Sequence, residues 1–288
     1  MNRCPLCQSE ACHLFKLGHT TVYRCLSKQC GLRFAWPQMD AKALEAAYRS
    51  FYYPGESVRH GVYSATPLPV LQQLMTSLGQ AESLRGQRLL DFGCGEGDLC
   101  LVAAEHGMVP TGIEYDDEAR RSAAKRLQRN IYKDFDALEL AEPDAQFDYV
   151  VLWEVIEHLR SPWLELSRLR QRMNRGAKLI ISTPNADCLK ARLLGARWSN
   201  YLNPTHFYYF DRVSLHRTLE RAGFVQCHEW LLLIQYPSHH PIRRRLHSWL
   251  VRHRLHGALL FVAENPGAQG HLSDECLRER CHAYSHCA

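Results

Sequence analysis

Short apolar runs alternate with helix-like segments between residues 85 and 264. The first run, Arg88–Phe92, ends in glycines, and in residues 98–106 after it apolar positions recur every three or four residues. This order predicts a strand, a tight turn and a helix. Strands that alternate with helices favour a parallel sheet covered by helices on both faces.

The remaining elements follow from the same patterns. We expect further strands at residues 109–114, 132–135, 149–152, 178–182, 224–235 and 258–263, and helices at residues 117–128, 161–173 and 211–222. The last two strands suit an antiparallel hairpin at one sheet edge, with residues 237–256 as their connection. The predicted fold class is therefore α/β, with a doubly wound, mostly parallel sheet of seven strands.

Length and composition indicate how the domain with this sheet is combined with other parts of the chain. The chain has 288 residues, of which 46% are hydrophobic and 23% charged, as in soluble globular proteins. This length holds one α/β domain and a small accessory unit. The plan that we predict has four parts: a Cys-rich head (1–37), a helical and aromatic connector (38–84), the α/β domain (85–266), and a polar Cys/His-rich tail (267–288).

The head contains two cysteine pairs with metal-ligand spacing. Cys4 and Cys7 are separated by seventeen residues from Cys25 and Cys30, within the range of a four-Cys zinc ribbon. Such a metal replaces the core that a unit of this size cannot build. We expect structural Zn²⁺ at these four residues; because the second pair is Cys-x4-Cys, Cys12 or His13 stays an alternative ligand.

Positive charge is local to one stretch of the chain. The formal net charge is +5, and residues 242–256 hold five Arg and no acidic residue. Apolar residues recur there at helical spacing, so the stretch is either a peripheral contact with membrane headgroups or an anionic substrate, or a solvated basic helix face. Neither a signal peptide nor a transmembrane run is recognisable, and we expect a cytoplasmic protein.

The glycine-rich turn after the first strand is the strongest functional signal. Gly93, Gly95 and Gly97 would let a cofactor approach the backbone at a helix N-terminus. Asp91 could bind a cofactor ammonium group or the turn itself, and Glu114 follows the next strand, where a carboxylate can bind both ribose hydroxyls. An ordinary strand–helix turn is the alternative. A dinucleotide site is disfavoured because Asp98 stands where its fingerprint requires Gly or Ala.

Residues 90–97 resemble motif I of the class I S-adenosylmethionine-dependent methyltransferases, and residues 112–115 resemble the acidic ribose-binding segment of that family. The resemblance implies a Rossmann-like fold, S-adenosylmethionine as cofactor, and Tyr115, Asp134 and Phe135 as further cofactor-binding residues. Residues 147–159, 206–211 and 219–224 are similar to the branch that contains the ubiquinone-biosynthesis O-methyltransferases.

Two carboxylates and a histidine follow the fourth predicted strand. Glu154, Glu157 and His158 would share one face if the chain became helical after residue 152. They could bind a divalent cation, or the imidazole could act as a general base. In resembling families this arrangement binds Mg²⁺ or another divalent ion, and His206 is a candidate further ligand or base. The alternative is that Glu157 and His158 only brace the segment.

Aromatic residues near this cluster and in the connector have open roles. Trp153 and residues 207–210 are expected either to form a wall of the substrate pocket or simply to pack in the core. The aromatic residues of the connector are expected either to form part of a lid over the cofactor or to pack the head onto the α/β domain; they are Tyr48, Phe51, Tyr52, Tyr53 and Tyr63. We expect the tail to be disordered. The less favoured alternative is a second metal site formed by its Cys and His residues, namely His271, Cys276, Cys281, His282, His286 and Cys287.

The acceptor class follows from the head. Residues 31–37 and the Cys-Pro-x-Cys start are similar to bacterial methyltransferases of sugars, lipids and polysaccharide precursors. Together these features imply O-methylation of a small metabolite, a glycan or a lipid-linked precursor. An RNA methyltransferase is less favoured, because residues 1–35 lack dense basic and aromatic side chains. A non-catalytic binding protein with the same fold is the other rival.

Overall fold

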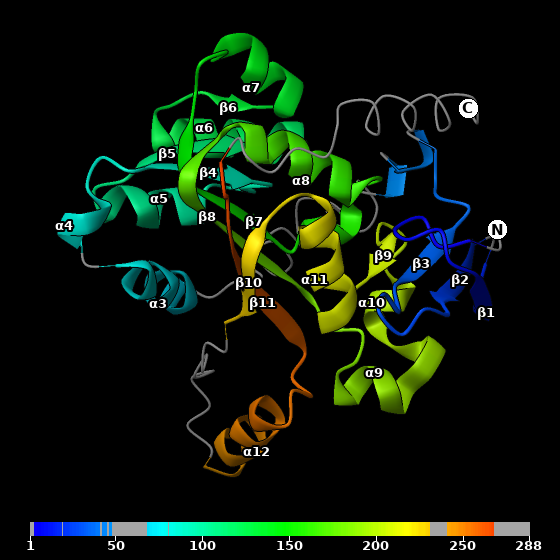
Figure 1. Ribbon diagram of the computed structural model, residues 1–288. Coiled ribbons are helices and arrows are strands. Elements are labelled where there is room, and N and C mark those ends of the chain that lie inside the picture. Colours follow the sequence, from blue (N-terminus) through cyan, green and yellow to red (C-terminus); the bar gives the residue numbers. More distant parts are fainter. Residues whose placement is uncertain are drawn as a thin grey trace.

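The computed structural model (Figure 1) describes residues 3–18, 20–40, 42–44, 46–47, 68–79, 81–230 and 241–267. The side chains of residues 68, 69, 81, 241–244, 247 and 248 are outside this description. The connector aromatics and the tail Cys and His residues named above also lie outside the described residues, and their roles stay predictions.

A seven-stranded sheet forms the centre of the molecule. Its order is β10 (Val225–Glu229), β11 (Ala258–Glu264), β8 (Met173–Pro184), β7 (Phe147–Trp153), β4 (Arg88–Phe92), β5 (Val109–Ile113) and β6 (Ile131–Tyr132). Neighbouring strands are parallel from β6 to β8, whereas β11 is antiparallel to β8 and β10 is antiparallel to β11. The mostly parallel seven-stranded sheet and its antiparallel edge hairpin are thereby confirmed.

Helices cover both faces of this sheet, because successive side chains of a strand point to opposite sides. One face packs against α3 (Leu68–Leu78) and α5 (Asp98–Glu105), and the other against α7 (Phe135–Ala141), α8 (Pro162–Gln171) and α11 (Arg212–Arg221). Leu89 belongs to the first core and its neighbour Leu90 to the second. Helix α6 (Asp117–Leu127) contacts α5, and α4 (Ala81–Leu84) precedes β4.

Two predicted strands have different bounds in the structure. The strand expected at 132–135 ends at Tyr132, because the Asp134 carboxylate accepts a hydrogen bond from Ala137 N at 2.8 Å and caps α7. Phe135 is therefore helical, and its prediction as a strand residue is wrong. Strand β10 ends at Glu229, and residues 231–235 of the long strand expected there lie outside the described residues.

The N-terminal head forms a second sheet that the main domain completes. Strands β1 (Ala11–Leu17), β2 (Thr20–Cys25) and β3 (Arg33–Trp36) are antiparallel, and β3 also pairs with β9 (Tyr208–Tyr209). Leu32 and Phe34 belong to the same hydrophobic core as residues of α8 and α11. The head is thus built into one side of the α/β domain (Figure 1).

The segment that supplies β9 was not predicted. After β8 the chain forms α9 (Leu189–Leu194), a 3₁₀ turn at Gly195–Arg197 and α10 (Ser199–Leu202) before it reaches β9. The helix expected within residues 242–256 is α12 (Pro241–Arg252). Helices α9 and α12 lie at the end of the molecule opposite α7 (Figure 1). Among the described residues, no helix has the length and apolar character needed to cross a bilayer.

Candidate active site

The glycine turn between β4 and α5 packs against the segment that carries His158. Gly93 has a φ of +84°, and a Cβ atom added there would lie 2.5 Å from Val155 Cγ2. Gly97 also has a φ of +84°, and its Cβ would lie 2.9 Å from Leu127 Cδ1. Both positions therefore require glycine for backbone conformation and for space. Gly95, with a φ of +54°, lies between them.

Glu114 joins this turn to the end of β5. Its Oε2 accepts a hydrogen bond from Gly95 N at 2.8 Å, and its Oε1 accepts one from Asp116 N at 2.8 Å. Each carboxylate oxygen has a second lone pair, so these bonds leave capacity for ribose hydroxyls. Glu114 is thus oriented by two backbone amides before any cofactor binds.

Asp91 is buried at the end of β4, with 3% of its surface exposed. The Cys100 thiol donates a weak hydrogen bond to its Oδ2 at 3.6 Å. Burial raises the pKa of Asp91 to about 7, and the nearby charges of Glu114 and Asp98 act in the same direction. A buried carboxyl beside a glycine turn, with only a thiol donor to stabilise its charge, fits a cationic group such as a cofactor ammonium.

The three residues predicted near the adenine differ in exposure and in the groups that could contact a cofactor. Tyr115 is 54% exposed, and Lys133 Nζ lies 5.6 Å from the centre of its ring. The Asp134 carboxylate caps α7. The Phe135 side chain is buried in the core near Phe92, so only its backbone can face a cofactor.

The chain after β7 does not become an α-helix, and the expected shared helix face is wrong. Glu154 has a φ of +55°, and Ile156–His158 form a single 3₁₀ turn. The Ser182 hydroxyl donates to Glu154 Oε1 at 2.7 Å, so this carboxylate faces β8. Glu154 is not one of the residues whose potential ligand atoms lie within 4.8 Å of one another in the group that His158 joins.

Glu157, His158 and His206 form that group instead. One potential ligand atom of each lies within 4.8 Å of the others, and the two imidazole rings meet edge to face with centres 4.6 Å apart. Glu157 Oε2 accepts a hydrogen bond from Thr183 Oγ1 at 2.9 Å, whereas its buried Oε1 has no hydrogen-bond partner among the described residues. Burial, together with the charge of Glu154, raises the pKa of Glu157 well above its usual range.

Two residues missed in the sequence, Asn203 and Thr205, determine how these imidazoles can act. Asn203 Oδ1 accepts hydrogen bonds from Thr205 N at 3.1 Å and Thr205 Oγ1 at 2.8 Å, so its amide group must donate to His206 Nε2, 2.9 Å away. Their sequence signal is Asn-x-Thr, an Asx turn beside His206. The Nε2 lone pair of His206 thus accepts a hydrogen bond from the Asn203 amide group.

His158 adopts the same tautomer through a different partner. Its Nδ1 lies 3.0 Å from the carbonyl oxygen of Thr205, which can only accept, so Nδ1 carries the proton and Nε2 carries the lone pair. Burial lowers the pKa of His158 to about 4, which keeps the ring neutral near pH 7. In this tautomer Nε2 is the nitrogen of His158 that could accept a proton.

Glu157, His158 and His206 could also bind a metal ion. One carboxylate and two imidazoles suit a transition metal better than Mg²⁺, which prefers oxygen ligands. Glu157 Oε1 and His158 fit such a site, whereas His206 could join it only after giving up its bond to Asn203.

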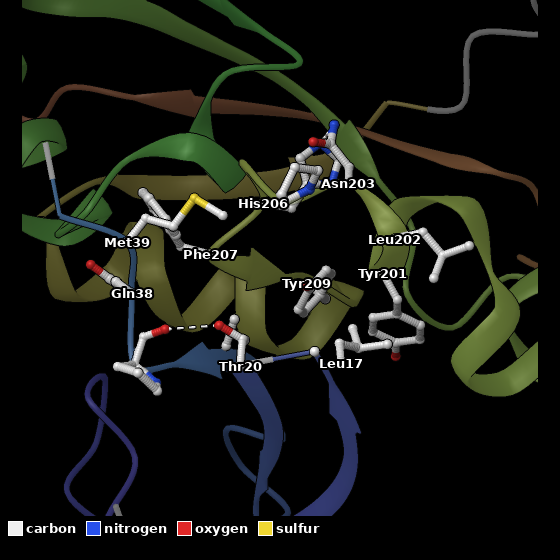
Figure 2. Close-up of a pocket in the computed structure, with 14 residues that line it drawn as sticks. Leu17, Thr20, Gln38, Met39, Tyr201, Leu202, Asn203, His206, Phe207 and Tyr209 are labelled. Atoms are coloured by element: carbon white, nitrogen blue, oxygen red, sulfur yellow. Dashed lines mark hydrogen bonds between the residues drawn. The ribbon is translucent and has the colours of Figure 1, made fainter. Parts of the chain in front are cut away.

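A cavity of about 270 Å³ opens beside His206 (Figure 2). Three parts of the chain line it: Leu17, Gly18, Thr20 and Ala35 from the head, Pro37, Gln38 and Met39 after it, and Tyr201, Leu202, Asn203, Pro204, His206, Phe207 and Tyr209. None of these residues is Asp, Glu, Lys or Arg. Of the predicted wall aromatics, Phe207 and Tyr209 line this cavity, whereas Tyr208 and Phe210 are core residues and Trp153 packs against the core.

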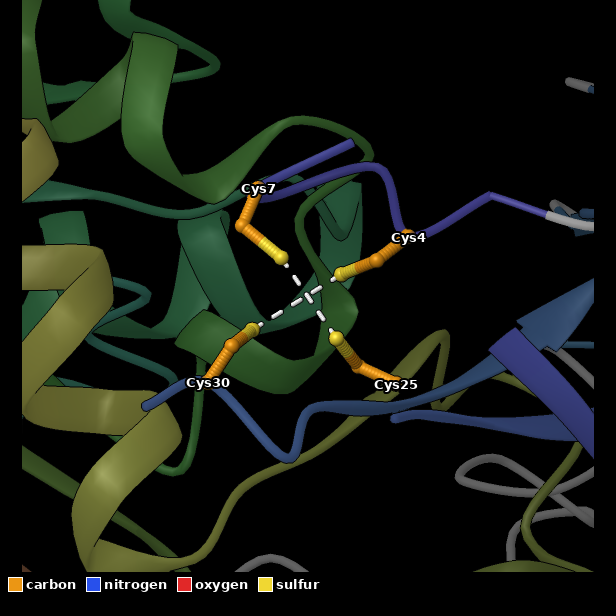
Figure 3. Close-up of side chains that lie close together, drawn as sticks. All are labelled: Cys4, Cys7, Cys25 and Cys30. Atoms are coloured by element: carbon orange, nitrogen blue, oxygen red, sulfur yellow. Dashed lines mark hydrogen bonds between the residues drawn. The ribbon is translucent and has the colours of Figure 1, made fainter. Parts of the chain in front are cut away.

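The four head cysteines converge on one point (Figure 3). The Sγ atoms of Cys4 and Cys30 are 3.7 Å apart, those of Cys7 and Cys25 are 3.4 Å apart, and all four lie within 4.8 Å of one another. A tetrahedral zinc with Zn–S bonds of ~2.3 Å requires S···S separations of about 3.8 Å. Cys12 and His13, the alternative ligands, lie outside the cluster. The hydrogen bond from Cys30 lowers the pKa of Cys4 to about 6.

Comparison with known proteins gives consistent matches. A family model described as "Methyltransferase domain" matches residues 68–229. The ubiquinone biosynthesis O-methyltransferase of Coxiella burnetii is 33% identical over 138 residues, which are 45% of this chain and 58% of that protein. The 27-O-demethylrifamycin SV methyltransferase of Amycolatopsis mediterranei is 30% identical over 138 residues, 44% of this chain and 51% of that protein. The chain thus spans about half the length of these curated relatives.

A solved structure extends the likeness to the whole fold. The 1,6-didemethyltoxoflavin-N1-methyltransferase of Burkholderia thailandensis, solved with 1,6-didemethyltoxoflavin and S-adenosylhomocysteine, aligns with a TM-score of 0.52. It covers 88% of this chain and 98% of its own, at 13% sequence identity. At that identity the likeness shows the fold alone.

Proposed function

Because the chain belongs to the methyltransferase domain family, we propose that it is an S-adenosylmethionine-dependent enzyme that methylates a hydroxyl group of a small, uncharged acceptor. The observation that carries the proposal is the position of His158. Its segment contacts the glycine turn through Val155, and its neighbour His206 lines the cavity. One short segment thus connects a donor site with an acceptor site.

The donor site would be held by residues of three strand ends. Bound S-adenosylmethionine supplies a methyl group that is already electrophilic. Asp91 would bind the ammonium group, Gly93, Gly95 and Gly97 would allow close approach of the backbone, and Glu114 would bind the ribose. Tyr115, Asp134 and the Phe135 backbone would surround the adenine, as the family resemblance implies.

The acceptor would lie in the cavity beside His206. Its lining has aromatic rings, amides and a hydroxyl but no charged side chain, which favours a neutral hydroxylated ring or a metabolite of similar polarity. A volume near 270 Å³ is at the small end for ligand sites, so a glycan or lipid-linked precursor would insert only one unit. His158 does not line this cavity, so the reacting hydroxyl would have to extend past His206 for His158 Nε2 to accept its proton. Alignment with the methyl group would supply most of the rate.

The proposal is tested by following the methyl group. The protein is incubated with methyl-labelled S-adenosylmethionine and a fractionated bacterial extract, and label is expected in small molecules or lipid. Label in RNA, with filter binding that weakens steeply as salt rises, would favour the RNA methyltransferase instead. A protein without measurable S-adenosylmethionine binding in calorimetry, or with binding unaffected by Glu114→Ala, would be the non-catalytic alternative.

Asp91 gives cofactor binding a pH dependence. Its pKa is raised from 3.8 to about 7, so below pH 7 the carboxyl must lose a proton before it can bind an ammonium group. We expect affinity to weaken up to about tenfold per pH unit below pH 7, with proton release measurable by calorimetry in buffers of different ionisation enthalpy. Asp91→Asn should bind more weakly and lose this dependence. An unchanged pH profile in that variant would contradict the assignment.

The cluster of Cys4, Cys7, Cys25 and Cys30 is proposed to hold one structural zinc. Cys30→Ala is expected to lose the metal and, because Leu32 and Phe34 share the main core, to lower the melting temperature by about 10 °C. Metal content and thermal unfolding measure both effects. Cys12→Ala is the matched control, since Cys12 lies in β1 outside the cluster, and it should keep its zinc. Equal zinc content in both variants would exclude this ligand set.

A further inference from the structure

Large apolar side chains are exposed on two neighbouring helices at one end of the molecule. Leu193 on α9 is 74% exposed, Leu194 beside it is 37% exposed, and on α12 Leu246 and Trp249 are 53% and 48% exposed. The turn after α12 is joined to the start of α9 by a hydrogen bond of 3.1 Å from Leu189 N to Leu255 O. We call this feature the α9–α12 surface.

An open apolar groove runs between the two helices. Leucines line most of it, namely Leu189, Leu193, Leu194, Leu250 and Leu255, and its volume is about 520 Å³. Other exposed leucines, such as Leu26 and Leu140, do not line this groove, whereas here several leucines surround one groove, and such clustering indicates a binding surface. Lys190 stands at the edge of the groove.

The charge of this surface is mainly positive, although Arg192 pairs with Asp187 and Arg254 pairs with Glu229. Residues 188–202 and 241–257 contain no Asp or Glu and hold eight of the 35 Lys and Arg, which leaves 27 basic against 30 acidic residues in the rest of the chain. Lys190, Arg197, Arg245 and Arg252 are exposed. Positive charge is therefore concentrated where the leucines are exposed.

We propose that the α9–α12 surface binds anionic lipid membranes, with its basic side chains at the headgroups and its leucines and Trp249 among the upper acyl chains. A basic and apolar surface complements an anionic bilayer in both respects. RNA is disfavoured because leucines do not stack on bases. A second copy of the same surface is disfavoured because like charges would face each other.

Vesicle flotation tests the proposal with the full-length protein. We expect binding to vesicles of phosphatidylcholine mixed with phosphatidylglycerol, weaker binding as salt rises, and little binding to phosphatidylcholine alone. Leu193→Glu and Trp249→Glu should each weaken binding about tenfold or more. Leu140→Glu is the matched control, because Leu140 is 87% exposed on α7 at the opposite end of the molecule, and it should bind as the wild type does.

Tryptophan fluorescence locates the contact. Lipids brominated on their acyl chains should quench the wild type more than Trp249→Phe, which retains the other five of the six Trp residues. The proposal is overturned by absence of binding to anionic vesicles, by equal loss in Leu140→Glu, or by variants that impair only RNA binding or self-association. Because vesicle binding needs no methyl transfer, its outcome is independent of the proposed activity.

Discussion

Replacing Gly93 with Ala is expected to abolish S-adenosylmethionine binding. The new Cβ would stand 2.5 Å from Val155 Cγ2, so either the glycine turn or the segment that leads to His158 must move. The residue also has a φ of +84°, which costs an L-residue about 1–2 kcal/mol. Calorimetric titration with the cofactor should show at least about a hundredfold loss of affinity, equivalent to roughly 3 kcal/mol, and thermal unfolding should shift downward.

Gly176→Ala separates the clash from the backbone strain. Gly176 has a φ of +79°, but nothing lies within 4 Å of the Cβ that would be added there. This variant should lose about 1–2 kcal/mol of unfolding free energy and retain cofactor affinity. If both variants bound the cofactor equally well, the glycine turn would not be the cofactor site.

Replacing His158 with Gln is expected to lower kcat by about 10²–10⁴-fold, the usual contribution of a general base. Its KM for S-adenosylmethionine should change little, because the imidazole would act on the acceptor proton. The pKa of about 4 also predicts that wild-type kcat/KM has no inflection near pH 6.5, since His158 is already neutral there. Steady-state kinetics from pH 5 to pH 8, with an identified acceptor, measure both effects.

His216→Gln is the control for this prediction. His216 lies on the outer face of α11, where 44% of its side chain is exposed, and the variant should retain full activity. Dialysis against a chelator distinguishes a base from a metal ligand. Activity that disappears and returns with added Mn²⁺ or Mg²⁺, while the zinc proposed at the four cysteines stays bound, would favour a divalent ion at Glu157, His158 and His206.

Burial of His158 also predicts an effect on stability. A neutral buried imidazole has its pKa lowered from 6.5 to about 4, so the unfolded chain binds more protons between these values. The contribution of His158 to the unfolding free energy is therefore fully present above pH 6.5 and is lost as the pH falls toward 4. His158→Gln should show a flatter decline over that range in denaturant titrations.

Much of the fold and of the donor site was predictable because it depends on local pattern. The alternation of strand-like and helix-like segments is visible in the sequence, and so are the glycines at positions 93, 95 and 97. Within the first strand, Leu89 and Leu90 point to opposite faces of the sheet. The confirmed seven-stranded sheet follows from that alternation. The bounds of β6 were wrong because a side-chain cap at Asp134 outweighed the apolar run.

The acceptor side could not be predicted in the same way. The proton on His158 is positioned by the carbonyl of Thr205, 47 residues away, and the cavity is lined by the head and by residues 201–209 together. Pairing of β3 with β9 and the α9–α12 surface likewise join distant segments. Such contacts leave no periodicity in the sequence of either partner.

The sequence by itself determined the alternation of strands and helices in the seven-stranded sheet, the glycine turn and the cysteine spacing, because each depends on residues that are neighbours in the chain. Only the tertiary structure decided that Glu154 faces β8 while Glu157, His158 and His206 meet, and that the head walls a cavity. The physical reason is that a positive φ at Glu154 and a 3₁₀ turn replace the expected helix. Which side chains then meet is decided by packing against segments distant in the chain.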